Sequence, residues 1–197
     1  MKKLRKRHKT LYQGRYLTLL EVNGWEFASR SNASGVVVLL AVTDNNELVL
    51  VEQFRVPVGS KVIELPAGLV GDLADRDESV LLAAQRELLE ETGYAAQNMQ
   101  VLMSCPSSAG MSDEIITFVL ATGLDKVAAG GGDSSEDIRV HVIALAEADR
   151  WLNGRQAAGT PLDPKIFSAL YWLRCDQSSP NARAIWQAYE KTNHELE

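Results

Sequence analysis

The first 70 residues have the pattern of β-strands, in which short apolar runs rich in β-branched residues are separated by turn residues. Asn23-Gly24, between two such runs, is a strong short-range signal for a β-hairpin. Asp44, Asn45 and Asn46 separate the next two runs and predict a second hairpin. The strands predicted in this part of the chain span residues 15–22, 25–30, 35–43, 47–55 and 61–68.

From residue 77 to residue 92 the apolar positions change to helical spacing. Leu81, Ala84 and Leu88 follow that spacing, and Gly93 stands where a helix would end. Further strands are predicted at residues 98–104, 114–121 and 138–145, and further helices at 146–153, 164–174 and 181–194. This order of elements predicts an α+β chain or an α/β sandwich built on a mixed sheet, with one internal helix.

Composition narrows the class of protein. A chain of 197 residues with 46% hydrophobic content fits a globular protein with one catalytic-sized domain. Residues 1–9 carry six Lys or Arg and no acid, so the net charge of −6 leaves the rest strongly acidic, which disfavours nucleic-acid and anionic-membrane partners. No apolar segment follows the basic start as in a signal peptide, and no run reaches the roughly 18 residues of a membrane helix. Cys105 and Cys175 are isolated, which indicates a reducing, cytoplasmic compartment.

The sequence RELLEETGY, residues 86–94, places Glu87, Glu90 and Glu91 on one face at the end of the predicted helix. Glu87 and Glu91 repel each other at i,i+4 spacing, and the helix dipole disfavours carboxylates just before Gly93. A divalent cation would remove both costs, and oxygen ligands without His or Cys favour Mg²⁺ or Mn²⁺ over Zn²⁺. From the residues alone, a solvated acidic helix face is the alternative. The sequence lacks both the GxGxxG pattern of dinucleotide-binding Rossmann units and the GxxxxGK[ST] pattern of P-loops. Nucleotide phosphates would therefore have to be bound in another way.

RELLEETGY resembles the R-E-U-x-E-E-x-G-U core of the Nudix hydrolases, where U is an apolar residue. Glu78 lies eight residues before Arg86, as the family pattern requires. The pattern's opening glycine is replaced by Asp72, and Gly68 lies ten residues before Glu78, which indicates a four-residue loop insertion. The segments LVEQFRVPVGSKVIELPAG, SSAGMSDE and SEDIRVHV are similar to the ADP-ribose pyrophosphatase branch, so the resemblance covers about residues 12–175.

The resemblance implies a fold and an organisation. The fold is an α/β/α sandwich with a mixed central sheet, plus an N-terminal antiparallel sheet that in this branch commonly joins a homodimer. The expected parts are a basic tail at residues 1–10, a dimerisation sheet at 11–34 and a Nudix hydrolase domain at 35–197.

The resemblance also implies a metal site. The expected ligands of Mg²⁺ or Mn²⁺ are the side chains of Glu87, Glu90 and Glu91 and the carbonyl oxygen of Ala67. Arg86 is expected to bridge Glu78 and Glu90 in support, because an always-charged planar fork suits holding two acids in fixed orientation. Without the resemblance, Arg86 and Glu90 would be an ordinary i,i+4 ion pair.

Five further residues match positions that contact substrate in this branch. Arg55 is expected to bind phosphate or sugar, and Ser112 and Glu114 to contact the substrate from the loop before the strand at 114–121. Trp25 and Glu26 are expected at the nucleobase, in the same subunit or in the partner, where an aromatic face suits base stacking. Packing in the core or the dimer interface is an equal alternative for Trp25.

The catalytic base is expected among the acids of the loop at residues 130–137. Glu136 matches one such acid in this branch, Asp133 lies nearby, and Glu91 is a further candidate for a catalytic role besides metal binding. Glu136 could instead be an extra metal ligand or a solvated loop acid.

The implied reaction is Mg²⁺-dependent hydrolysis of a nucleoside diphosphate sugar to a nucleoside monophosphate and a sugar phosphate. Ala109 stands where relatives have proline, which opens GDP-mannose and UDP-glucose beside ADP-ribose. The alternatives are a Nudix pyrophosphohydrolase acting on nucleoside triphosphates or dinucleoside polyphosphates, a non-catalytic Nudix-fold nucleotide-binding regulator, and an acidic interaction protein without a site.

Overall fold

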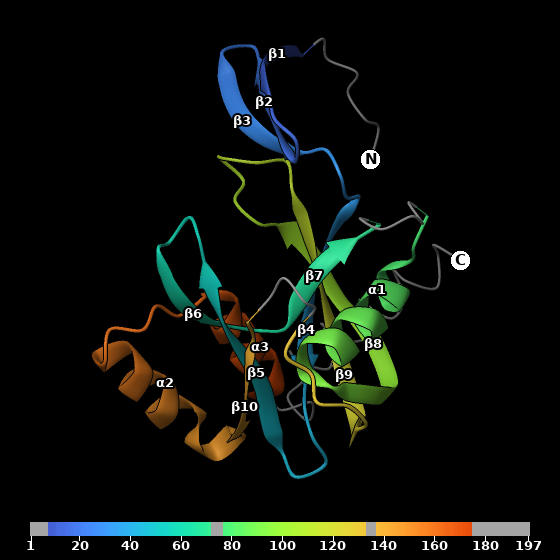
Figure 1. Ribbon diagram of the computed structural model, residues 1–197, viewed down its shortest axis with the longest axis vertical. Coiled ribbons are helices and arrows are strands. Elements are labelled where there is room, and N and C mark those ends of the chain that lie inside the picture. The colour runs from blue at the N-terminus through green and yellow to red at the C-terminus, as the bar shows by residue number, and fades with distance from the viewer. Residues whose placement is uncertain (1–7, 72–76, 133–136, 175–197) are drawn as a thin grey trace, which may run out of the picture.

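The computed structural model describes residues 8–71, 77–132 and 137–174 (Figure 1). The strands are β1 (Lys9–Gln13), β2 (Leu17–Val22), β3 (Trp25–Arg30), β4 (Gly35–Ala41), β5 (Glu47–Arg55), β6 (Ser60–Glu64), β7 (Ala67–Val70), β8 (Tyr94–Pro106), β9 (Ile115–Lys126) and β10 (Arg139–Ala144). The helical elements are α1 (Val80–Glu87), a π-helical turn (Leu88–Thr92), a 3₁₀ turn (Leu145–Glu147), α2 (Ala148–Ala157) and α3 (Lys165–Arg174). No helix within these ranges is long and apolar enough to cross a bilayer. The helix predicted at 181–194 lies outside the described residues.

The N-terminal sheet has the antiparallel order β1-β2-β3 and stands at one end of the molecule (Figure 1). The hairpin predicted at Asn23-Gly24 is confirmed, because both residues adopt positive φ, 54° and 82°, as such turns require. β1 extends this sheet into a part of the chain where no strand was expected. Large apolar side chains on the sheet are exposed, among them those of Leu11, Tyr12, Leu17, Leu19 and Trp25.

Two sheets form the centre of the molecule, with orders β7-β4-β9-β8 and β10-β5-β6. The pair β4–β9 is parallel and the other pairs are antiparallel, which confirms the mixed central sheet. The turn predicted between 35–43 and 47–55 is present, since the Thr43 amide donates to the Glu47 carbonyl at 2.9 Å, but the two strands do not pair as a hairpin. Because β7 and β9 occupy both edges of β4, the chain passes into the other sheet after a single bridge between Val42 and Leu48.

The strand predicted at residues 61–68 is in fact two strands. Pro66 cannot donate to a strand ladder, and the chain changes sheets there, so that β6 pairs with β5 while β7 pairs with β4. The carbonyl of Pro66 accepts a hydrogen bond from the Leu39 amide at 2.8 Å, which fixes the crossing point.

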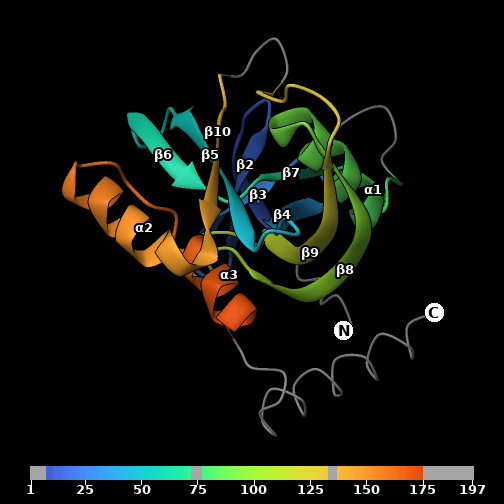
Figure 2. The ribbon, with the colours of Figure 1, turned by 90° about the horizontal axis from the view of Figure 1, so that it is seen from below.

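The helices cover opposite faces of the sheets (Figures 1 and 2). Ala83, Ala84 and Leu88 of the first helical region pack with β4 and β9 in one apolar cluster. Leu152 of α2 and Ile166 of α3 pack in a second cluster on the other side. Burying a side chain of this size contributes about 1.5–3 kcal/mol, so the two clusters hold the layers together. The α/β/α sandwich is confirmed.

Candidate active site

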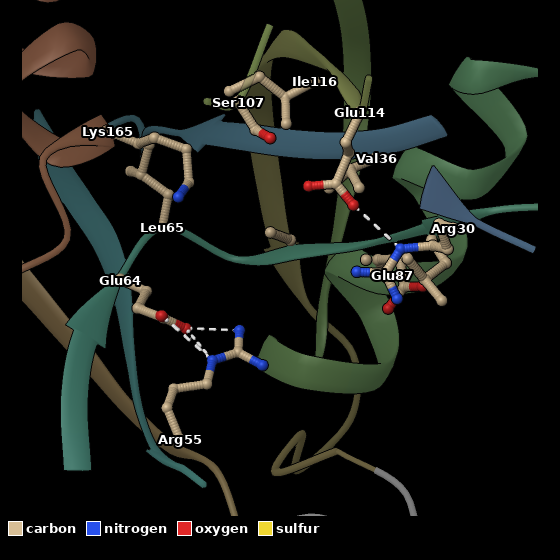
Figure 3. A pocket seen from close by; sticks show the side chains of 13 residues that line it. Arg30, Val36, Arg55, Glu64, Leu65, Glu87, Ser107, Glu114, Ile116 and Lys165 are labelled. Carbon is tan, nitrogen blue, oxygen red and sulfur yellow. Dashed lines mark hydrogen bonds and ion pairs between the residues drawn. The ribbon is translucent and has the colours of Figure 1, made fainter. Parts of the chain in front are cut away.

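A pocket of about 460 Å³ opens where the two central sheets meet the N-terminal sheet (Figure 3). It draws residues from β3, β4, β5, β6, β7, α1, the loop before β9, β9 itself, and α3. Its lining consists of Arg30, Val36, Arg55, Glu64, Leu65, Ala67, Gly68, Leu69, Glu87, Ser107, Glu114, Ile116 and Lys165. Six of these side chains carry a charge, so the pocket suits a polar, charged ligand rather than an apolar one.

Two of the predicted metal ligands converge on the start of β7. Glu87 is buried, and its carboxylate lies against Gly68, where an added Cβ would stand only 1.8 Å from the carboxyl carbon. Glu91 is 2% exposed, and its Oε2 accepts a hydrogen bond from the Ala67 amide at 3.1 Å. Glu91 therefore contacts Ala67, whose carbonyl oxygen was predicted as a backbone ligand, and Glu87 lies against the next residue, Gly68.

Arg86 holds three of the acids around this point. Its Nε and Nη2 donate to the two carboxylate oxygens of Glu78 at 3.0 and 3.2 Å. Its Nη1 donates to Glu87 Oε1 at 2.8 Å and to Glu90 Oε2 at 3.3 Å. The predicted bridge between Glu78 and Glu90 is thus present, and it extends to Glu87. These contacts fix the guanidinium beside Glu87, which lines the pocket.

The same contacts shift two pKa values. Hydrogen bonds from Arg86, and then from the Gly71 amide at 3.0 Å, hold the pKa of Glu78 below its ordinary value against the opposing effect of burial. The hydrogen bond to Glu78 raises the pKa of Arg86 further, although burial opposes it. Both groups therefore carry full charge near neutral pH.

The residues present fit a hard divalent cation by their chemistry. In the described ranges, no three His, Cys, Asp or Glu side chains are already arranged around a common point, and Glu87 and Glu90 instead contact Arg86. The side-chain groups shown at Ala67 and Gly68 are nevertheless carboxylates, those of Glu91 and Glu87 respectively. Oxygen donors of this kind suit Mg²⁺ or Mn²⁺.

The helix that carries the glutamates ends in an unusual way. Ser79 caps the start of α1, because its side chain accepts from the Leu82 amide at 3.3 Å, and α1 is followed by the π-helical turn that contains Glu90 and Glu91. Such turns occur frequently at functional sites. Lys126 Nζ donates to the carbonyl oxygen of Thr92 at 2.5 Å, which places a cation at the negative end of the helix dipole.

The segment after β9 is hydrogen-bonded to the same helix end. The amide of Gly131 donates to the Glu91 carbonyl at 2.8 Å, and the amide of Gly132 donates to the Glu90 carbonyl at 3.0 Å. Glu136 and Asp133, the candidate bases, lie outside the described residues. Their assignment stays a prediction, but the chain that leads to them is attached to the backbone of two predicted metal ligands.

The predicted substrate residues lie in different places. Arg55 and Glu114 line the pocket, and each is in an ion pair, Arg55 Nη2 with Glu64 Oε2 at 2.6 Å and Glu114 Oε1 with Arg30 Nε at 2.9 Å (Figure 3). Ser112 is one step removed, with its Oγ 3.2 Å from Oγ of the lining residue Ser107.

Trp25 and Glu26 lie away from this pocket. They follow the turn between β2 and β3 and are exposed, and neither belongs to the pocket lining of the same chain. Their predicted contact with a nucleobase stays a prediction that requires another subunit or a bound substrate.

The N-terminal sheet is fastened to the loop that carries Ser112. The Ala28 amide donates to the Met111 carbonyl at 2.8 Å, and Ser29 Oγ donates to Asp113 Oδ2 at 2.9 Å. These contacts place Arg30, at the end of β3, beside Glu114. A smaller cavity of about 260 Å³ adjoins the pocket and shares this ion pair as a wall.

Sequence reasoning missed Arg30, Glu64 and Lys165 as pocket residues. Glu64 had a usable signal, because it is a charged residue within the apolar strand sequence VIELP, and buried acids are rare unless they are paired. Arg30 and Lys165 had none, since a single basic residue at the end of a strand or the start of a helix is usually solvated.

Replacing Gly68 by alanine is expected to lower the rate of catalysis about 10- to 100-fold, as loss of a positioning contact at a metal site does. The new Cβ would stand 1.9 Å from Glu87 Oε1, and this flexible carboxylate would swing away from β7 rather than unfold the protein. Steady-state kinetics measures the loss of rate, and a thermal melt of the same variant shows whether the fold is kept. Gly154→Ala in α2, where nothing lies within 4 Å of the added Cβ, is the matched control. A Gly68→Ala enzyme as active as this control would contradict the proposed placement of Glu87.

The family comparison agrees with this geometry. The NUDIX domain profile matches residues 32–182. The methanol dehydrogenase activator of Bacillus methanolicus is 34% identical over 145 residues, which cover 73% of this chain and 74% of that protein. The ADP-ribose pyrophosphatase of Bacillus subtilis is 31% identical over 145 residues, with the same shares covered.

Two further comparisons are consistent with these. The ADP-ribose pyrophosphatase of Mycobacterium tuberculosis is 39% identical over 117 residues, which cover 59% of this chain and 55% of that protein. A solved structure described as an ADP compounds hydrolase superposes with a TM-score of 0.65, over 88% of this chain and 95% of that chain, at 24% identity. At that identity the superposition supports the fold alone.

Proposed function

This chain belongs to the NUDIX domain family and is a Nudix hydrolase, and we propose that it hydrolyses the diphosphate bond of a nucleoside diphosphate sugar such as ADP-ribose. The observation that carries the proposal is the convergence of Glu87 and Glu91 on the start of β7, in the wall of a pocket that also contains two ion-paired arginines. The products would be a nucleoside monophosphate and a sugar phosphate. The names of the two ADP-ribose pyrophosphatases support this substrate class.

The cation would be held by Glu87, Glu90, Glu91 and the carbonyl oxygen of Ala67. When bound, Mg²⁺ or Mn²⁺ supplies a water of lowered pKa and offsets charge on the phosphoryl oxygens. Arg86 keeps Glu87 oriented toward the pocket through its 2.8 Å contact, and Glu78 fixes Arg86 through two more.

The arginines of the pocket would bind the diphosphate. Arg55 is positioned by Glu64, whose two carboxylate oxygens both accept from the guanidinium. A guanidinium held in this way still presents donors to a phosphate in a planar array, and little side-chain entropy is lost when the substrate binds. Arg30, held by Glu114, occupies another wall of the same pocket.

Removal of the proton from the attacking water is assigned to Glu136 or Asp133. Support comes from the attachment of Gly131 and Gly132 to the carbonyls of Glu91 and Glu90, because this attachment brings the segment that precedes both acids to the metal ligands. A carboxylate within hydrogen-bond reach of the water acts as a general base.

A homodimer through the N-terminal sheet is the proposed assembly, in the cytoplasm. The exposed side chains of Tyr12, Leu17 and Leu19 share one face of the N-terminal sheet by strand register, and a second copy would cover them. Association would also bring Trp25 of a partner copy within reach of a substrate base.

A non-catalytic regulator is the second candidate function. One observation favours it, the name methanol dehydrogenase activator given to a relative with 34% identity. The predicted metal-binding acids Glu87, Glu90 and Glu91, with Arg86 and Glu78, are all present here, as a hydrolase requires.

A substrate panel separates the candidates. ADP-ribose, GDP-mannose, UDP-glucose, NADH and dGTP would each be incubated with the protein and Mg²⁺ or Mn²⁺, with EDTA as the control, and the products resolved by chromatography. We expect metal-dependent release of monophosphate and sugar phosphate from the nucleotide sugars. Turnover of dGTP alone would indicate that the substrates are nucleoside triphosphates instead of nucleotide sugars. No turnover of any compound would favour the non-catalytic regulator.

A further inference from the structure

Among the described residues that line the pocket, Lys165 comes from the C-terminal helical region. Every other described residue of the lining lies before residue 117, whereas Lys165 is the first residue of α3. Figure 3 shows its side chain at the pocket wall opposite Arg30 and Glu87, on the side where Arg55 and Glu64 also lie. The proposed function gives this lysine no task.

Asp163 accepts hydrogen bonds from both the backbone amide and the side-chain ammonium of Lys165. Its Oδ1 accepts from the Lys165 backbone amide at 2.8 Å, as a helix cap does, and its Oδ2 accepts from Lys165 Nζ at 2.5 Å. The side chain of Asp163 is 14% exposed and that of Lys165 is 31% exposed. The ammonium is therefore kept at one place in a partly desolvated site, where charges interact more strongly than in water.

The strand that positions Lys165 also positions Arg55. The amide of Asp163 donates to the Ile63 carbonyl at 2.9 Å, and the amide of Ile63 donates to the Pro161 carbonyl at 3.0 Å. Residues 161–163 thereby extend along β6, and the next residue of β6 is Glu64, which holds Arg55. Two cations are thus fixed to adjacent positions of one strand.

We propose that Lys165 is a substrate-binding residue that, together with Arg55, binds the diphosphate oxygens on the side of the pocket away from Glu87. An ammonium has three donors, and one of them is used by Asp163, so two can reach phosphate oxygens. The three lining cations, Arg30, Arg55 and Lys165, each have a carboxylate partner, so each is oriented before the substrate arrives. The assignment rests on the proposed function, because it takes a diphosphate as the ligand.

Binding measured without turnover tests the assignment. Calorimetric titration of ADP-ribose in EDTA would compare the wild type with Lys165→Gln, Lys165→Arg and Arg174→Gln. Arg174 is the matched control, because it lies at the other end of α3 in an ion pair with Asp149 and outside this pocket. We expect Lys165→Gln to raise the Kd about tenfold or more, the loss typical of a hydrogen bond to a charged group. Lys165→Arg should recover part of the affinity, and Arg174→Gln should match the wild type.

Steady-state kinetics adds a second measurement, the KM, which would not change if Lys165 had only a structural role. With Mg²⁺, Lys165→Gln is expected to raise the KM by a similar factor, with kcat within about threefold of the wild type, because the lysine contacts atoms away from the reacting phosphate. If Lys165→Gln leaves both Kd and KM equal to those of Arg174→Gln, whatever its effect on the Tm, the lysine side chain only pairs with Asp163 and the inference is wrong.

The same data separate this inference from the proposed function. A wild type that binds ADP-ribose but hydrolyses nothing overturns the hydrolase proposal, while the Kd comparison still decides the role of Lys165. A wild type that binds neither ADP-ribose nor inorganic pyrophosphate overturns both.

Discussion

Replacing Glu87 by glutamine is expected to lower kcat for the diphosphate substrate by about 10³-fold, which corresponds to about 4 kcal/mol of transition-state stabilisation. The amide has the shape of the carboxylate, and its oxygen can still accept the 2.8 Å hydrogen bond from Arg86 Nη1. What is lost is a negative oxygen beside Gly68, at the point where the cation would be held. The fold should persist, because the replaced side chain keeps its volume and its main contact.

Kinetics across a range of Mg²⁺ concentrations measures this effect. The variant should need more Mg²⁺ for half-maximal activity and should not reach the wild-type rate at saturation. Glu147→Gln is the matched control. Glu147 is a half-exposed acid just before α2 that forms an ion pair with Arg150, and it lies outside the pocket. If kcat of Glu87→Gln stayed within about threefold of this control, the proposal that Glu87 binds the metal would be wrong.

Replacing Gly93 by alanine is expected to destabilise the protein by about 3 kcal/mol or more, equivalent to a fall in Tm of roughly 6–12 °C. Gly93 ends the helix with φ of 70°, a conformation that costs other residues about 1 kcal/mol. The added Cβ would also stand 2.2 Å from the Ala128 carbonyl oxygen. That backbone cannot retreat easily, because the amides of Val127 and Ala128 both donate to the Gly93 carbonyl, at 2.9 and 3.0 Å.

Gly59→Ala separates the two causes. Gly59 also has φ of 70°, but nothing lies within 4 Å of its added Cβ, so this control measures the backbone cost alone. Thermal and urea unfolding of both variants gives the difference due to the collision with Ala128. Equal destabilisation of the two variants would show that the chain after β9 yields freely and does not constrain the helix end.

The cluster of Arg86 and the glutamates could be predicted from the sequence because its parts are local. Arg86 and the three glutamates occupy six consecutive positions, and helical spacing alone puts them on one face. Their partner Glu78 is only eight residues away. Local spacing does not predict the widening of α1 into a π-helical turn, nor the hydrogen bonds that Lys126, Gly131 and Gly132 donate to the carbonyls of that turn.

The rest of the pocket depends on contacts between distant parts of the chain. Arg30 reaches Glu114 because β3 bonds to a loop 84 residues later in the chain. The same limit applies to the sheets. Apolar runs identify β4 and β5 as strands, but each is buried on both faces, so the pattern does not say which strands they pair with.

At Pro66 the chain passes from the β10-β5-β6 sheet to the β7-β4-β9-β8 sheet, and the groups assigned to substrate binding and to chemistry lie on different sides of this point. On one side, β6 positions Arg55 through Glu64 and Lys165 through residues 161–163, and these groups are assigned to recognition. On the other side, β7 meets the carboxylates of Glu87 and Glu91, which are assigned to chemistry. On these assignments, mutations in the β10-β5-β6 half would alter which diphosphate is accepted without displacing Glu87 and Glu91. Such a division gives natural selection, or a protein engineer, a way to change specificity while the reaction is retained.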